Sequence, residues 1–187
     1  SIDVICCGDT YVVHGAATND SITLWTTSGD GTFIWPANLH TTYTPGPNDC
    51  ASGSVLLTFT VDGYNPCNSV YDQMILNITP APTANITNDS IDVICCGDTY
   101  VVHGAATNDS ITLWTSSGTG TFSWPANLHT TYTPSAADEA AGSVILTLTV
   151  DGYNPCHSVY DQMTLNIVCP PTADAGINDN VCQGQTY

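Results

Sequence analysis

The chain has 187 residues, 42% of them hydrophobic, and it carries 17 Asp plus Glu but no Lys or Arg, which gives a net charge of −17. Without basic side chains it cannot neutralise phosphate groups, so nucleic acid is excluded as a partner and an anionic membrane surface repels the chain. No apolar run approaches the ~20 residues of a membrane-spanning helix, and ion pairs with Lys or Arg are unavailable, so stability has to come from burial, hydrogen bonds and cross-links.

The chain is a tandem repeat. Its first 25 residues return unchanged 89 positions later, and the two copies differ at 13 of 79 positions. The segment 173–187 again matches the entry to the second copy, which predicts a stretch cut from a longer array. The predicted units are 1–79 (first repeat), 80–89 (linker and entry strand), 90–168 (second repeat) and 169–187 (linker and first strand of a third repeat).

Short β-rich segments alternate with turn residues along each copy. In the sixth segment Val55, Leu57, Phe59 and Val61 occupy every second position, which is typical of a strand with one buried face. Trp25 on the third segment is the predicted central core aromatic. Seven strands at about ten-residue spacing predict an all-β fold in which each repeat is a seven-stranded Ig-like β-sandwich. The predicted strands of the first copy are 2–6, 10–15, 21–27, 31–35, 40–44, 54–61 and 70–78.

The connectors between repeats are short and contain proline. They read TPAPTAN (79–85) and CPPTADAG (169–176). Proline fixes φ and favours extended linkers, so neighbouring domains are predicted to lie end to end as a semi-rigid rod.

Four segments together resemble a known class of proteins. They are the entry 173–187, LWTSSGTGTF (113–122), YTPSAADEAAGSVILTLTV (132–150) and the closing NPC-x-S-V-Y-D-Q-M-x-L-N-I of both copies. The chain resembles the Ig-like or PKD-like tandem repeats of bacterial cell-surface adhesins, including the giant repeat proteins of gliding bacteria. This resemblance implies a secreted protein at the bacterial cell surface, attached to it or filamentous.

Nine cysteines without a C-x-x-C pair predict disulfides and an oxidising, extracellular setting. Each copy has a vicinal pair after its first strand, a Cys in its last hairpin turn, and one private Cys. In an Ig-like domain the vicinal pair and the private Cys lie at one pole and the hairpin turn at the other, about 16–27 Å away, whereas bridged Cα atoms lie within about 7 Å. The preferred pairs are therefore Cys7–Cys50, Cys96–Cys169 and, across the domain boundary, Cys6–Cys156.

A rival scheme stays open on the sequence. It pairs Cys6 with Cys67 and Cys95 with Cys156 inside each copy, leaving Cys182 unmatched. The preferred scheme instead leaves Cys67, Cys95 and Cys182 to bond outside this stretch of sequence.

Two kinds of sequon predict covalent glycans. Asn-x-Ser/Thr acceptors occur at Asn19, Asn77, Asn85, Asn88 and Asn108. Asp-Ser-Ile occurs at Ser21, Ser90 and Ser110, and it is similar to the Asp-Ser/Thr-aliphatic O-glycosylation acceptor of bacteria that carry these repeats. A sugar coat would hide exposed strand edges in an array of near-identical domains.

Carboxylates near the two boundaries are candidate ligands for Ca²⁺, which prefers oxygen donors. They are Asp89 and Asp92 at the first boundary and Asp174 and Asp179 at the second. No other cofactor is predicted.

Two functions follow, neither of them enzymatic, because no nucleophile motif accompanies the histidines. The first is a structural one: a stalk, fibre or sheath whose partners are further copies of the repeat, in the same chain or in a homopolymer, and glycans. The second is a polysaccharide- or surface-binding adhesin module that stacks sugars on exposed Trp35, Trp124, Tyr43 or Tyr132.

Overall fold

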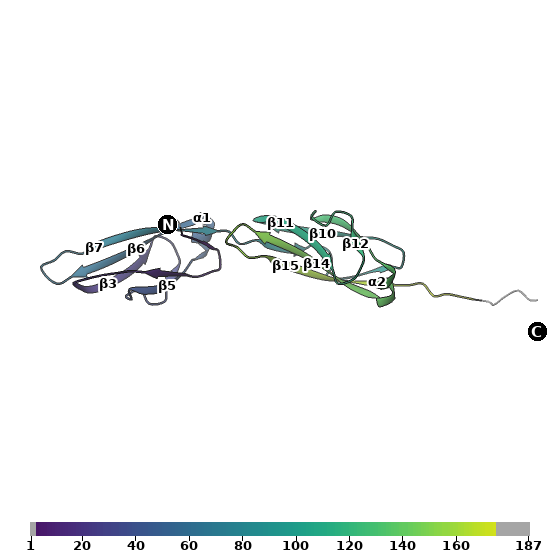
Figure 1. The fold of residues 1–187 in the computed structure, drawn as a ribbon, viewed down its shortest axis with the longest axis horizontal. Coiled ribbons are helices and arrows are strands. Elements are labelled where there is room, and N and C mark those ends of the chain that lie inside the picture. The colour runs from purple at the N-terminus through teal and green to yellow at the C-terminus, as the bar shows by residue number, and fades with distance from the viewer. Residues whose placement is uncertain (1–2, 175–187) are drawn as a thin grey trace, which may run out of the picture.

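The computed structural model describes residues 3–174, which form two β-sandwich domains arranged end to end (Figure 1). The elements of the first domain are β1 (Asp3–Cys6), β2 (Tyr11–His14), β3 (Asp20–Thr27), β4 (Thr32–Phe33), β5 (His40–Thr44), α1 (Pro47–Ser52), β6 (Ser54–Gly63) and β7 (Val70–Thr79). Those of the second are β8 (Thr83–Ile86), β9 (Ile91–Cys95), β10 (Tyr100–Thr107), β11 (Asp109–Ser116), β12 (Thr121–Phe122), β13 (His129–Thr133), α2 (Ala136–Ala141), β14 (Ser143–Gly152) and β15 (Val159–Val168).

The strand order is that of an Ig-like sandwich. In the first domain one sheet runs β1-β7-β6-β3 and the other β2-β5-β4. β1 pairs in parallel with β7, and the remaining neighbours are antiparallel. The second domain repeats this order and adds β8 at the edge of β10, so it has eight strands. The all-β, tandem Ig-like prediction is confirmed.

Each domain has its own core between its two sheets. Val55, Leu57 and Phe59 of β6 point inward as their alternation predicts. Trp25 is buried against Phe59, with ring centroids 4.7 Å apart. Trp25 is therefore the central core aromatic that the sequence predicts.

The two short helices, α1 and α2, were not predicted from the sequence. They have six residues each, too few for a helical period to emerge. Their ends are set by single residues: Pro47 stands in the first turn of α1, and Gly53 and Gly142 end the helices with φ of 74° and 76°. This left-handed conformation favours glycine.

A buried carboxylate holds each helix against the sandwich. Asp138 is 2% exposed and accepts hydrogen bonds from the N–H groups of Thr119 (2.9 Å), Gly120 (2.8 Å) and Ser135 (2.9 Å) and from the hydroxyl of Tyr132 (2.8 Å). The carboxylate thus has four donors in place of a cation.

The first domain contains the same corner. Asp49 accepts from Tyr43 at 2.6 Å and from the N–H groups of Gly31 and Gly46, both at 3.0 Å. The prediction that Tyr43 and Tyr132 are exposed stacking platforms is wrong, because both rings are fully buried and their hydroxyls serve this corner.

The corner shifts the pKa of its groups. Burial acts to raise the pKa of Asp138, but the hydrogen bonds from the Ser135 and Thr119 N–H groups and the Tyr132 hydroxyl outweigh it and lower this pKa to about 2. Burial and the bond to Asp49 raise the pKa of Tyr43 to about 12.

We predict that Asp138→Asn lowers the free energy of unfolding of the second domain by about 2 kcal/mol at pH 7. The folded-state pKa of Asp138 lies below its unfolded value, so its stabilisation is present above about pH 4 and is lost as pH falls towards 2. Urea unfolding should show wild type and variant converging over that range. The exposed Asp98→Asn is the control, and a constant difference down to pH 2 would contradict this account.

Candidate functional site: the joint between the domains

A three-residue linker, Pro80 to Pro82, connects β7 to β8. Pro82 is buried against Gly152, where a Cβ atom would lie only 2.9 Å from the proline ring. The side-chain amide of Asn108 donates to the carbonyl of Ala81 at 2.9 Å. The linker is therefore packed on the second domain and does not hang free between the two.

The strand after the linker belongs to the second domain. β8 pairs with β10 from Thr83–Thr107 to Ile86–Gly104, and the N–H of Ile86 donates to the Asp161 carboxylate at 2.7 Å. Ile86 is 8% exposed and joins the core. β8 thus anchors the linker in the second sandwich, and it lies within the segment 80–89 predicted as linker and entry strand.

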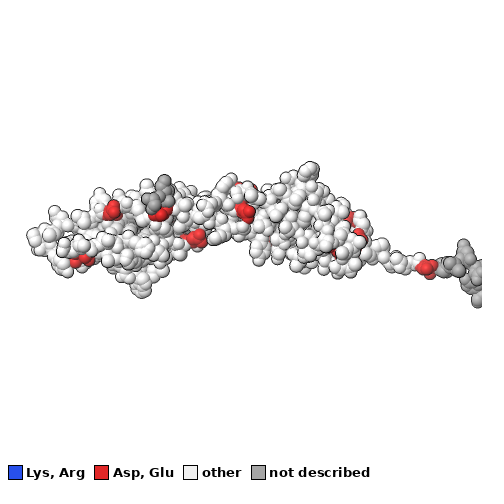
Figure 2. Space-filling model, in the orientation of Figure 1, with Lys and Arg blue, Asp and Glu red and all other residues white. Residues whose placement is uncertain are grey.

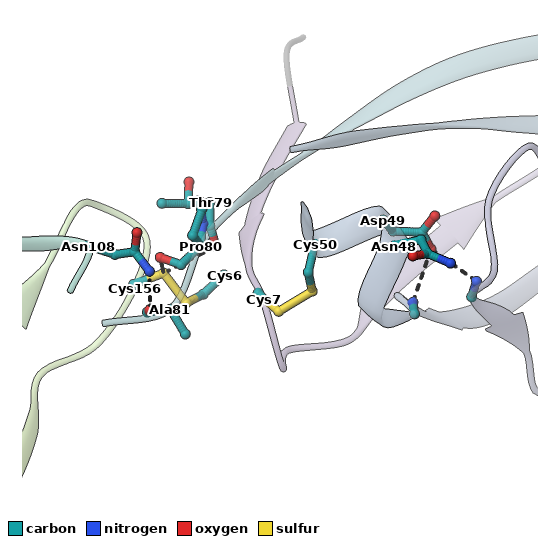
Figure 3. Close-up of a disulfide and its surroundings, with 12 residues drawn as sticks. Cys6, Cys7, Asn48, Asp49, Cys50, Thr79, Pro80, Ala81, Asn108 and Cys156 are labelled. Carbon is teal, nitrogen blue, oxygen red and sulfur yellow. Dashed lines mark hydrogen bonds between the residues drawn. A yellow bond between two sulfur atoms is a disulfide. The ribbon is translucent and has the colours of Figure 1, made fainter. Parts of the chain in front are cut away.

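Two disulfides leave the vicinal cysteines in opposite directions (Figure 3). Cys7 bonds Cys50 on α1, with Cα atoms 5.5 Å apart, inside the first domain. Cys6 bonds Cys156 in the β14–β15 hairpin of the second domain, with Cα atoms 4.8 Å apart. The end of β1 is therefore linked covalently to both domains.

A third disulfide joins Cys96 to Cys169, with Cα atoms 4.8 Å apart. It joins the counterpart of Cys7 to the residue that follows β15, within the second domain and at the pole remote from the joint. The structure therefore contains the three pairs that the pole argument prefers. The rival pairs Cys6–Cys67 and Cys95–Cys156 are not formed, because the hairpin turn and the vicinal pair lie at opposite ends of each sandwich. Cys67 and Cys95 are exposed thiols, and Cys182 lies outside the described residues.

Of the three disulfides, the one that crosses the joint, Cys6–Cys156, closes the longest loop. Cys6 and Cys156 are 150 residues apart, and closing such a loop costs the unfolded chain about 5 kcal/mol in the chain-entropy model. Because the loop includes most of both domains, this bond couples their stabilities as well as their orientation.

The Asp-Ser-Ile serines lie on the surface. Ser21 and Ser110 are exposed near the start of β3 and β11, and each hydroxyl donates to two carbonyls of the neighbouring strand. Ser90 is exposed just before β9. All three serines are within reach of a modifying enzyme.

The asparagine sequons differ in how far their amides are engaged. Asn19 and Asn85 are exposed. The Asn77 amide donates to the carbonyl of Asp3, and the Asn108 amide donates to the carbonyl of Ala81. The Asn88 amide donates to the Tyr100 hydroxyl and to the carbonyl of Val101. Of the five, Asn19 and Asn85 are thus the more accessible acceptors.

Among the described residues, the candidate Ca²⁺ ligands do not form a cluster. Asp92 accepts a hydrogen bond from the Tyr100 hydroxyl at 2.7 Å, and this bond lowers the pKa of Asp92. Asp89 is exposed, and Asp179 lies outside the described residues. Within residues 3–174 no three His, Cys, Asp or Glu side chains lie close enough to share a metal ion, Asp174 included.

Acidic side chains are scattered over the visible face and are not gathered into one patch (Figure 2). Each copy carries seven acidic residues.

The helices between residues 3 and 174 are six residues long, and neither is long and apolar enough to cross a membrane.

Trp35 and Trp124 are exposed at 67% and 69%, as the binding hypothesis requires. Each follows the short strand β4 or β12, and its backbone N–H donates to a threonine hydroxyl at 3.0 Å. Each ring therefore projects from a hydrogen-bonded backbone position.

Comparison with known proteins bears on the fold. No protein-family model and no curated protein sequence matches the chain. The structure is similar to extracellular domains 3-5 of Drosophila OTK, at 15% identity and a TM-score of 0.50, over 89% of this chain and 59% of that one. It is also similar to the insect immune protein hemolin, at 11% identity and a TM-score of 0.52, over 91% of this chain and 45% of that one. The chain spans less than two thirds of either structure, and the likeness supports tandem Ig-like domains.

We predict that non-reducing peptide maps of the protein contain one cluster in which the Cys6-Cys7 peptide carries both the Cys50 and the Cys156 peptides. Cleavage at Asp or aromatic residues is needed because trypsin has no site in this chain. Reduction should separate the three. A map in which Cys67 is joined to Cys6 would refute the joint described above.

Proposed function

We propose that the chain is a structural segment of a secreted bacterial surface fibre or adhesin stalk, whose domains are held end to end by disulfide-stapled joints. The observation that carries this proposal is the Cys6–Cys156 bond across the domain boundary. A bond between domains restricts their bending, which suits a protein that transmits length or force. Its disulfides support an extracellular setting, since reducing compartments keep thiols free.

The near-identity of the two copies supports the same function. A binding site built once needs only one domain, whereas length grows with every copy. The linker contacts made by Asn108, Ala81, Pro82 and Gly152 have counterparts in sequence at Asn19, Pro170, Pro171 and Gly63, so the same joint can recur along an array.

Glycosylation at the Asp-Ser-Ile serines is part of the proposal. The exposed side chains of Ile22 and Leu24 follow Ser21, and those of Ile111 and Leu113 follow Ser110. Bare apolar side chains on a sheet promote association between domains, and a glycan beside them would shield them. Intact-mass analysis of native material should show hexose additions that localise to Ser21, Ser90 or Ser110.

A second function is favoured by the two exposed tryptophans. Stacking of sugar rings on Trp35 and Trp124 would make each domain a carbohydrate-binding module. Titration with soluble polysaccharides should then quench tryptophan fluorescence in the wild type and lose the effect in Trp35→Ala/Trp124→Ala. No quenching by any polysaccharide tested would count against this function.

Small-angle X-ray scattering tests the proposed stalk. We expect the wild type to scatter as a narrow rod, and Cys6→Ser/Cys156→Ser to show a wider distribution of interdomain distances with a smaller mean radius of gyration. Cys7→Ser/Cys50→Ser is the matched control, because it removes one disulfide that lies within a domain. Equal scattering from both double variants and the wild type would show that the interdomain bond does not set the shape.

A further inference from the structure

Each domain carries a pair of histidines that face each other across two antiparallel strands. His14 of β2 lies opposite His40 of β5, and His103 of β10 lies opposite His129 of β13. The Nδ1 atoms of the two rings are 3.1 Å apart in both pairs. All four side chains are exposed, so each domain presents the same two imidazole nitrogens to solvent.

The strand register builds the pair. At the next position of the ladder the N–H of Gly15 donates to the carbonyl of Leu39 at 2.6 Å. The N–H of Gly104 makes the same bond to the carbonyl of Leu128 at 2.8 Å. The histidines therefore occupy a non-hydrogen-bonded position of the antiparallel ladder, where facing side chains come closest.

The backbone of the second pair is held at both of its polar groups. The N–H of His103 donates to the side-chain oxygen of Asn88 at 2.6 Å, and its carbonyl accepts from the N–H of Thr87 at 2.8 Å. Val102, the preceding residue, is fully buried in the core. Binding at the His103 ring therefore costs less conformational freedom than binding at a ring on a mobile loop.

The spacing of the two nitrogens matches that of adjacent ligands on one metal ion. Imidazole nitrogens bind Zn²⁺ at about 2.0–2.1 Å, and two such bonds to nitrogens 3.1 Å apart enclose an angle of about 100°. Neighbouring ligands subtend about 90° in an octahedral site and about 109° in a tetrahedral one. The ring planes are inclined by 61° and 59°, and rotation about each Cβ–Cγ bond aims both lone pairs at a common point.

Imidazole donors select the class of metal. They suit Cu²⁺, Zn²⁺ and Ni²⁺, whereas Ca²⁺ and Mg²⁺ prefer oxygen ligands. The chain contains no Lys or Arg that would repel a cation, and its net charge of −17 raises the concentration of cations near the surface. The pairs therefore favour a divalent transition metal.

We propose that each histidine pair binds one divalent transition-metal ion, held by the Nδ1 atoms of His14 and His40 in the first domain and of His103 and His129 in the second. Water fills the remaining coordination positions, because within residues 3–174 no third His, Cys, Asp or Glu side chain lies close enough to join a pair. The inference goes beyond the proposed stalk function and does not depend on it. It gives the rod one ion site per domain.

Binding requires a change of tautomer in one ring of each pair. Without metal, the Nδ1–H of one ring donates to the Nδ1 of the other. Coordination through both Nδ1 atoms requires both rings to carry their proton on Nε2. The donating ring therefore gives its Nδ1 proton to water and takes one up at Nε2, and no net proton is released.

Long-range ¹H–¹⁵N NMR spectra of the imidazole rings test the site. The untagged chain should carry Cys67→Ser, Cys95→Ser and Cys182→Ser, because thiolates bind the same ions. On titration with zinc sulfate at pH 7.5 we expect the Nδ1 resonances of the four paired histidines to shift and to saturate at two Zn²⁺ per chain. His157, which is exposed and outside both pairs, should not shift. Unchanged Nδ1 resonances in the pairs, or an equal shift at His157, overturns the proposal.

Variants test whether both rings of a pair are required. In isothermal titration calorimetry on the same chain, His129→Gln should weaken Zn²⁺ binding at least tenfold at one of the two sites, and His40→Gln/His129→Gln should do so at both. His157→Gln is the matched control and should retain both sites. Emission from the buried Trp114 verifies that each variant is folded. Cu²⁺ should bind more tightly than Zn²⁺, as it does at nitrogen sites generally. Equal Zn²⁺ binding by the double variant and the control overturns the proposal.

Discussion

The structure depends on one electrostatic constraint, which is that no Lys or Arg side chain exists to neutralise its acidic side chains. Inside each domain the constraint is met by backbone donors, and Asp49 and Asp138 keep their charge because N–H groups and a tyrosine hydroxyl surround them. Two units of like charge have to be held in contact at the joint, and a covalent bond does this at any ionic strength.

The joint combines a strand, a packed linker and a disulfide, and each depends on the others. β8 anchors the chain in the second sandwich, and Pro82 on Gly152 fixes the distance between the domains. That distance brings Cys156 to Cys6. The adjacent Cys7–Cys50 bond holds the end of β1 on α1, which Asp49 in turn fixes to the sandwich through the Tyr43 hydroxyl. A chain of short-range contacts thus runs from one core to the other.

The parts that could be predicted from sequence are those with a strong local signal. The alternation in 54–61 predicted a strand with one buried face, and Trp25 on the third segment was predicted in the core. The length of a strand placed the cysteines of each domain at two opposite poles. The buried Asp49 and Asp138 were not predicted, because an acidic residue in a turn normally points to water and only the tertiary corner supplies its donors. The burial of Tyr43 was not predicted either, because its hydroxyl bonds to Asp49 in the same tertiary corner. The pairing of the entry strand β8 with β10 was not predicted, since Thr83–Ile86 is short and follows two prolines.

Residual dipolar couplings measured on the oxidised chain test most directly whether the joint makes one body of the two domains. The account predicts that both domains share one alignment tensor in the oxidised chain, and that Cys6→Ser/Cys156→Ser separates it into two tensors of different magnitude. Two unequal tensors in the oxidised wild type would contradict a rigid joint and leave two independent domains on a tether.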